Sequence, residues 1–250
     1  AAHREMFENP RKLFRKDGRI CDEVLALVGE VRMASAKAGF YSMSVPEGLG
    51  GAGFGMLAYY VCWEELFRTC GPANWLMLYA ISHWAFGPSQ VLERVTPRAQ
   101  NEILGPMMAG EQSMCFGLSE PGAGSDASKL NTEAIGDGDG WRTSGRKIWT
   151  SNAPVAGFCI VFARTEASEG SGISAFLVPS SSPGFHIERI IKMFGSLGGD
   201  EAELRFEDAK VEPWQLVGGL HQGFATAIYG VSIGRIYNSA RAVGYGRWAL

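Results

Sequence analysis

The sequence predicts an α+β fold in which a helical region precedes a β domain and a long helix follows it. Two changes of pattern predict this order. Up to about residue 112 apolar residues recur at helical spacing, and from Ser113 they alternate with polar residues as in strands. From Gln222 to Leu250 the helical pattern returns. We therefore expect an N-terminal helical domain over 1–112 and an antiparallel β barrel or sandwich over 113–217. Residues 218–250 are expected to begin a C-terminal helical bundle that is incomplete in this chain.

Composition excludes several classes of protein. The 250 residues are 46% hydrophobic and 20% charged, as in ordinary globular proteins. A net charge of −3 with scattered basic residues argues against nucleic-acid binding. No run approaches the roughly 18 apolar residues of a membrane span, and the first residues lack the apolar segment of a signal peptide. The five cysteines lack C-x-x-C spacing and the four histidines are far apart. We therefore predict a cytoplasmic protein with reduced cysteines and no metal site.

Within the first domain the pattern predicts helices over 22–37, 56–69, 73–86 and 96–109, and a short helix or loose arm over 1–20. Thr96-Pro97 is typical of a helix start. Gly48, Gly50 and Gly53 satisfy the G-x-G-x-x-G spacing of dinucleotide-binding proteins. That motif needs a buried strand before it. Because Pro46 argues against such a strand, a loop between helices is the better interpretation.

The β domain is expected to contain short, closely spaced strands, which is typical of a small barrel or sandwich. The turn Asp137-Gly-Asp-Gly140 predicts a hairpin. The expected strands are 113–119, 128–135, 141–149, 157–164, 173–178, 184–190 and 202–207.

Two stretches carry the candidate chemistry. The first, Cys115-Phe-Gly-Leu-Ser-Glu-Pro-Gly-Ala-Gly-Ser-Asp126, runs from a strand into a glycine-rich turn. It presents hydroxyls, a carboxylate and backbone N–H groups, which suit a ligand with oxygens and a flat polar edge. The second, Lys147-Ile-Trp-Thr-Ser-Asn152, ends a strand with an indole beside two hydroxyls. Taken singly, each stretch is better explained as an ordinary turn or strand end.

Together these stretches resemble the paired flavin-binding signature of acyl-CoA dehydrogenases. Further matches extend the resemblance in the family's order over about residues 20 to 250. They are Val45-Pro-Glu-Gly-Leu-Gly-Gly-Ala-Gly, Phe206-Glu-Asp-Ala-Lys-Val-Glu-Pro, Gly223-Phe and Gly234-Arg-Ile. The resemblance implies FAD held between the β domain and a helical bundle. It also implies an acyl-CoA substrate, oxidised to its 2,3-enoyl-CoA by removal of the α-proton and transfer of the β-hydride to flavin N5. An electron-transfer flavoprotein or similar acceptor and a homo-oligomer, dimer or tetramer, are implied as well.

The resemblance also implies roles for individual residues. The strand before the first turn is expected to lie along the flavin ring, Trp149 to stack near it, and Thr150 and Ser151 to bond toward N5 and O4. Ser125 is expected to serve both the cofactor and the pantetheine arm of CoA. The expected cofactor residues are Phe116, Leu118, Ser119, Ser125, Trp149, Thr150 and Ser151.

The catalytic base has no candidate in this chain. In most family members it lies beyond the position of Leu250, and in a minority it lies where Gly234 stands here. Residues 222–250 contain no Asp or Glu. The resemblance places Arg235 near the thioester, and Ser232 where many relatives have an aspartate that contacts CoA. We therefore expect this chain to be inactive by itself.

Two alternatives remain open on the sequence. One is a flavin-dependent monooxygenase on the same architecture, which would need an oxygen-activating site in place of a carboxylate base. The other is a non-catalytic partner subunit of a heteromeric acyl-CoA dehydrogenase.

Overall fold

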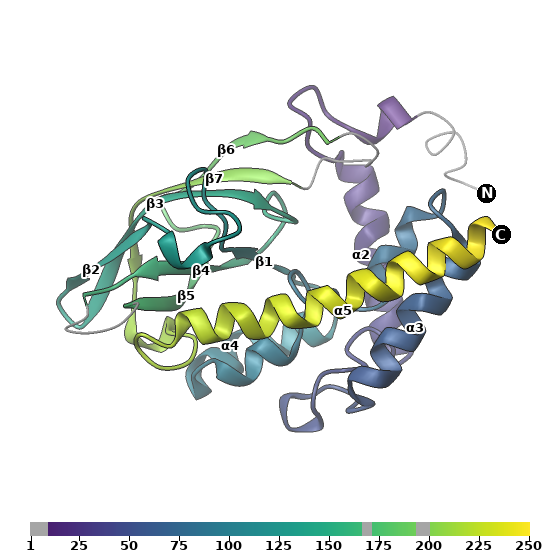
Figure 1. Ribbon diagram of the computed structural model, residues 1–250, viewed down its shortest axis with the longest axis horizontal. Coiled ribbons are helices and arrows are strands. Elements are labelled where there is room, and N and C mark those ends of the chain that lie inside the picture. Colours follow the sequence, from purple (N-terminus) through teal and green to yellow (C-terminus); the bar gives the residue numbers. More distant parts are fainter. Residues whose placement is uncertain (1–9, 167–171, 194–200) are drawn as a thin grey trace.

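The computed structural model describes residues 10–166, 172–193 and 201–250, which form a helical region, a curled sheet and one long helix (Figure 1). The predicted fold class is confirmed. Of the arm expected over 1–20, residues 1–9 lie outside the described part. The remainder contains a short 3₁₀ helix, Pro10–Leu13. The α-helices are α2 (Asp22–Lys37), α3 (Gly55–Cys70), α4 (Pro97–Met108) and α5 (Gly223–Ala249).

Local chemistry explains where α4 begins. The Thr96 hydroxyl accepts a hydrogen bond from the Ala99 backbone N–H at 3.2 Å, and Pro97 fills the first helical position. A hydroxyl at this position satisfies one of the backbone donors that the first turn leaves free. The same hydroxyl donates to the Trp214 carbonyl at 2.6 Å, which ties the helix start to the segment after the sheet.

The predicted helix over 73–86 is wrong. Only Trp75–Tyr79 is helical, as a 3₁₀ helix, and the chain then turns. Ser82 explains the difference, because its N–H donates to the Tyr41 carbonyl at 2.8 Å and its hydroxyl to the Pro88 carbonyl at 2.8 Å. These tertiary hydrogen bonds replace the bonds that a continuous helix would make.

The sheet has seven strands among the described residues and is mixed. β1 (Met114–Gly117) pairs in parallel with β4 (Phe158–Arg164), which also pairs antiparallel with β5 (Ile173–Pro179). The other strands form an antiparallel group in the order β2, β3, β7, β6. Their bounds are Glu133–Asp137, Gly140–Thr150, Ala202–Val211 and Phe185–Ile190. The two groups join through a single parallel pair, Glu133 with Arg164, so the sheet curls at that point (Figure 1).

Apolar side chains fill both sides of this sheet. One buried cluster lies between the sheet and the helices, and includes Ile103 of α4, Ile160 of β4 and Ala227 of α5. A second cluster lies on the other face and includes Val161 and Phe206. Figure 1 shows α5 running from the sheet past α4 to α3. One long helix therefore connects the core of the sheet to the core of the helical region.

One face of α5 carries three large apolar side chains that the described residues leave largely uncovered. Ile228, Ile236 and Val243 are between 39% and 52% exposed, whereas the Trp248 indole lies against Gly71, the residue after α3. The sequence predicted that a helix apolar on all sides needs neighbours to bury it. In the described part of the chain, that condition is met on one side only.

The opposite side of α5 packs so closely that a glycine is required. A Cβ at Gly234 would lie 2.5 Å from Cε2 of the Trp84 indole. We expect Gly234→Ala to lower the free energy of unfolding by about 1–2 kcal/mol, because the overpacking exceeds the gain in helix propensity. Urea denaturation monitored by circular dichroism measures this. Gly246→Ala is the matched control, because its Cβ would meet nothing within 4 Å, and it should stabilise by up to about 1 kcal/mol. Equal effects of the two changes would contradict the packing argument.

Candidate functional site

A cavity of about 180 Å³ lies where the ends of β1 and β3 approach α5. Five of the seven residues predicted to hold a cofactor line it, together with residues of the loop after Tyr79 and one residue of α5. The lining residues are His83, Trp84, Ala85, Phe116, Leu118, Ser119, Trp149, Ser151 and Val231. The two sequence stretches singled out above therefore meet at one place.

A backbone hydrogen bond ties the two strand ends together. The Ile148 N–H donates to the Ser119 carbonyl at 2.9 Å, one residue before Trp149. On the β1 side, Phe116 packs edge-on against Trp84 with ring centroids 5.2 Å apart. It also contacts Phe162 of β4 at 4.7 Å. Aromatic rings thus form one side of the cavity, and the backbone of the two joined strand ends forms another.

Trp149 is held in an unusual conformation. Its φ is 59°, in the left-handed region, and its side chain is 55% exposed. The pairing of β3 with β7 shifts register between Lys147 and Thr150, as in a β-bulge. A bulge re-aims the side chains around it. A bulky residue in the left-handed region is uncommon and is found most often at functional sites.

Thr150, between Trp149 and Ser151, faces away from the cavity, as alternation along a strand requires. Thr150 is 1% exposed, does not line the cavity, and its hydroxyl has no partner among the described residues. Ser151 does line the cavity, and its hydroxyl donates to a carboxylate oxygen of Glu201 at 2.5 Å. Because a serine hydroxyl has one proton, the Ser151 oxygen is left as an acceptor on its cavity side.

Three other predicted residues lie away from the cavity. Ser125 is exposed in the turn after β1, and Ser232 and Arg235 are exposed on α5. Their neighbour Val231 lines the cavity instead. The two flavin motifs thus meet at the cavity, whereas the three residues predicted to contact CoA do not line it.

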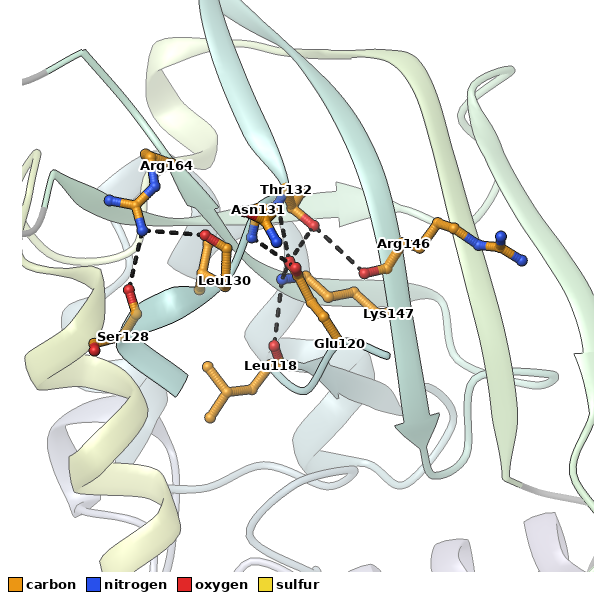
Figure 2. Close-up of polar contacts among 9 residues, drawn as sticks. All are labelled: Leu118, Glu120, Ser128, Leu130, Asn131, Thr132, Arg146, Lys147 and Arg164. Carbon is orange, nitrogen blue, oxygen red and sulfur yellow. Dashed lines mark hydrogen bonds and ion pairs between the residues drawn. The ribbon is translucent and has the colours of Figure 1, made fainter. Parts of the chain in front are cut away.

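A buried ion pair lies next to both strand ends (Figure 2). Lys147 is 0% exposed and donates to Glu120, 7% exposed, at 2.8 Å, and to the Leu118 carbonyl at 3.3 Å. Burial by itself raises the pKa of Glu120. The Lys147 charge and hydrogen bonds from Lys147, Thr132 and the Asn131 backbone lower it by more than burial raises it, so the pKa is lowered overall. Burial lowers the pKa of Lys147, and Glu120 partly opposes this shift. Since donors surround the carboxylate, the charged form of the pair is the one that this geometry stabilises.

Comparison with known proteins agrees with this arrangement. Residues 4–111 match the family model for the acyl-CoA dehydrogenase N-terminal domain, and residues 115–209 match that for the middle domain. The chain belongs to the acyl-CoA dehydrogenase family.

Among its relatives is the human short-chain specific acyl-CoA dehydrogenase, mitochondrial, 37% identical over 85% of this chain and 51% of the relative. A caffeyl-CoA reductase-Etf complex subunit of Acetobacterium woodii is 32% identical over 88% of the chain and 58% of the relative. The chain thus spans about half the length of the curated relatives it matches.

Solved acyl-CoA dehydrogenases share the fold. A protein from Mycobacterium smegmatis described as a putative acyl-CoA dehydrogenase superposes with a TM-score of 0.83, at 24% identity, over 99% of this chain and 61% of its own. An acyl-CoA dehydrogenase from Bacillus anthracis, described as complexed with FAD, gives 0.73 at 22% identity over 97% and 42%. At these identities the likeness concerns the fold alone.

One wall of the cavity was not predicted from the sequence, because its residues belong to no motif of the acyl-CoA dehydrogenase family. His83, Trp84 and Ala85 follow the 3₁₀ helix and belong to no motif of the resemblance. The Ala85 N–H donates to His83 Nδ1 at 3.2 Å, and the imidazole stacks on Phe86 at 3.9 Å. The close-packing glycines of α5 were the only sequence signal for Trp84, because Gly230 and Gly234 leave room for its indole.

None of the helices in residues 10–166, 172–193 and 201–250 has the length and apolarity that crossing a membrane requires. In the same residues no three His, Cys, Asp or Glu side chains lie together as a metal site would need.

The buried His83 should make the free energy of unfolding depend on pH. Burial, with a smaller effect of the Arg241 charge, lowers the pKa of His83 to about 3. The unfolded chain therefore binds the extra proton from about pH 6.5 downward, and stability falls as the pH falls through this window. Between pH 7 and pH 5 we expect a loss of up to about 2 kcal/mol, measured by urea denaturation. His83→Phe, which keeps an aromatic ring against Phe86, should reduce this slope. An unchanged slope in the variant would refute the assignment to His83.

Proposed function

We propose that this chain is the FAD-binding part of an acyl-CoA dehydrogenase that converts an acyl-CoA thioester to its 2,3-enoyl-CoA. One observation carries the proposal. The ends of β1 and β3, which bear the two family motifs, converge on a single cavity and are joined by the Ile148–Ser119 backbone bond. Two ordinary turns would have no reason to share one wall.

The residues present fit a flavin. A flat heteroaromatic ring needs an apolar face and polar groups at its edge, and the cavity offers Trp149 and Phe116 beside the Ser119 and Ser151 hydroxyls. When bound, FAD would supply the hydride acceptor. Phe116, Leu118, Ser119, Trp149 and Ser151 would hold it. Trp149 would exclude water from one side, and the Ser151 oxygen would accept a hydrogen bond at the polar edge.

The substrate side of the proposal rests on fewer contacts. Ser125, Ser232 and Arg235 stay predicted contacts of CoA, in exposed positions that an extended ligand can reach. The Gly234 position favours a base elsewhere in the complete enzyme, because the Trp84 indole fills the space that a side chain would need. Glu120 is not available as a base either, since its oxygens already accept hydrogen bonds from Asn131, Thr132 and Lys147.

The partners belong to the same proposal. An electron-transfer flavoprotein as acceptor is supported by the relative from Acetobacterium woodii, whose name places it in an Etf complex. Assembly as a homo-oligomer, dimer or tetramer, is consistent with the uncovered apolar face of α5. The cytoplasmic location stays a prediction, whereas the human relative is named mitochondrial.

FAD titration of the purified protein tests the central claim. We expect one FAD per chain, with quenching of tryptophan fluorescence and a perturbed flavin absorbance band. With an acyl-CoA panel and an artificial electron acceptor, the 250-residue chain should show no turnover although it binds FAD. Absence of FAD binding would refute the proposed function, and turnover would refute the claim that the base is missing. Rapid reaction of the reduced protein with oxygen would instead favour the monooxygenase alternative.

Two substitutions test the lining residues. We expect Trp149→Ala to weaken FAD binding by about 3- to 10-fold, because a stacking contact is worth about 0.5–1.5 kcal/mol. Ser151→Ala should cost about the same, through one hydrogen bond. Trp248→Ala is the matched control, since Trp248 is 50% exposed but lies at the far end of α5. Equal losses from Trp149→Ala and Trp248→Ala would argue against stacking at this cavity.

A further inference from the structure

The buried pair of Glu120 and Lys147 has a role that the motifs themselves do not explain. Each member lies within two positions of a residue that lines the cavity, since Glu120 directly follows Ser119 and Lys147 lies two positions before Trp149. Neither member lines the cavity itself. The pair is therefore placed to influence both strand ends without touching a ligand.

The Glu120 carboxylate is fully engaged by the protein (Figure 2). Its Oε1 accepts from the Lys147 ammonium at 2.8 Å, from the Thr132 N–H at 2.9 Å and from the Thr132 hydroxyl at 2.5 Å. Its Oε2 accepts from the Asn131 N–H at 2.6 Å. Three donors thus hold Oε1 and one holds Oε2, so the position of the carboxylate is fixed through both of its oxygens.

These bonds connect three separate segments of chain. Glu120 ends the β1 stretch, Lys147 belongs to β3, and Thr132 lies in the segment before β2. That segment is held from its other side by Arg164, which donates to the Ser128 and Leu130 carbonyls at 3.0 and 3.1 Å. The carboxylate is thus the point at which the glycine-rich turn returns to the sheet.

A motif glycine makes this convergence possible. Gly145 has a φ of 151°, and a Cβ there would lie 2.5 Å from the Thr132 hydroxyl oxygen. Any side chain at this position would push Thr132 away from Glu120. The Gly and Lys of the stretch Gly145-Arg-Lys147 therefore serve the same carboxylate.

Stability alone is a poor explanation for such a pair. Removing two charges from water costs several kcal/mol per ion, and a packed apolar pair of similar volume is often at least as stable. What a saturated ion pair adds is a fixed geometry, because each donor must keep its place. We propose that Glu120 and Lys147 are positioning residues that set the spacing between Leu118–Ser119 and Trp149–Ser151, and thereby the grip on the flavin. This inference rests on the proposed FAD binding.

The charges predict a second signature. The pair as a whole is neutral, and Lys147 Nζ lies 3.3 Å from the carbonyl of Leu118, a cavity residue. Glu120→Gln leaves a cation near the site, which stabilises a reduced flavin that carries negative charge. Lys147→Met leaves an anion, which does the opposite. The flavin midpoint potential should therefore rise in the first variant and fall in the second.

The test compares Glu120→Gln, Lys147→Met and the double variant in the purified protein, by FAD titration, thermal unfolding and the flavin midpoint potential. Both single variants should unfold at a lower temperature and bind FAD at least about tenfold more weakly than the parent. The double variant, which buries no unpaired charge, should recover most of its thermal midpoint while its FAD affinity stays about tenfold low. If single variants fail to fold, the double variant still decides the matter.

Arg146→Met is the matched control. Arg146 is the neighbour of Lys147 on β3 and is also ion-paired, to Glu188 and Glu203, but its side chain is 54% exposed. Its FAD affinity should stay within about twofold of the parent. A double variant with both parental stability and parental affinity would overturn the inference, as would potentials that shift in the same direction in both single variants. Failure of the parent itself to bind FAD would instead overturn the proposed function.

Discussion

The closing contact between β1 and β3 is the constraint on which the cavity depends. Within the sheet, β1 reaches β3 only by way of β4 and β2, and β4 joins β2 through the single pair Glu133–Arg164. Such a path leaves the separation of the two strand ends weakly determined. The Ile148–Ser119 backbone bond and the Lys147–Glu120 ion pair close the curl directly. Since the cavity wall is made of the residues on either side of these bonds, its shape follows from them.

Periodicity and turn chemistry were enough to predict the order of elements. The strand expected over 141–149 is observed as Gly140–Thr150, and the helix expected over 22–37 has those bounds. These elements are determined locally, by alternation, by glycine-rich turns and by helical spacing. The helix expected over 73–86 is not, because the Ser82 N–H donates to the distant Tyr41 carbonyl and the Ser82 hydroxyl to the Pro88 carbonyl beyond a turn. The parallel pairing of β1 with β4 likewise depends on the whole sheet.

The same distinction applies to the site. The motifs identified which stretches meet, but not which side chains of a stretch face the ligand. Trp149 and Ser151 line the cavity while Thr150 enters the core, because alternation along a strand directs residues i and i+2 to one face and the residue between them to the other, although the motif grouped all three. His83 and Trp84 were missed for another reason. They come from a turn whose course is fixed by tertiary contacts, so that nothing in their own neighbourhood of the sequence marks them.

The cavity is lined by uncharged side chains, because the carboxylates near it are paired or hydrogen-bonded to other residues. The lining residues carry no charged side chain once His83 is neutral, and the low pKa of His83 keeps it so at neutral pH. Glu120 is neutralised by Lys147, and the Glu201 carboxylate is bonded to the Ser151 hydroxyl of the wall. A wall of this kind binds a flat, largely uncharged ring better than an anion, because it has no cation to offset the desolvation of a negative group. Any ionised group in this site therefore has to come from outside the residues that line the wall.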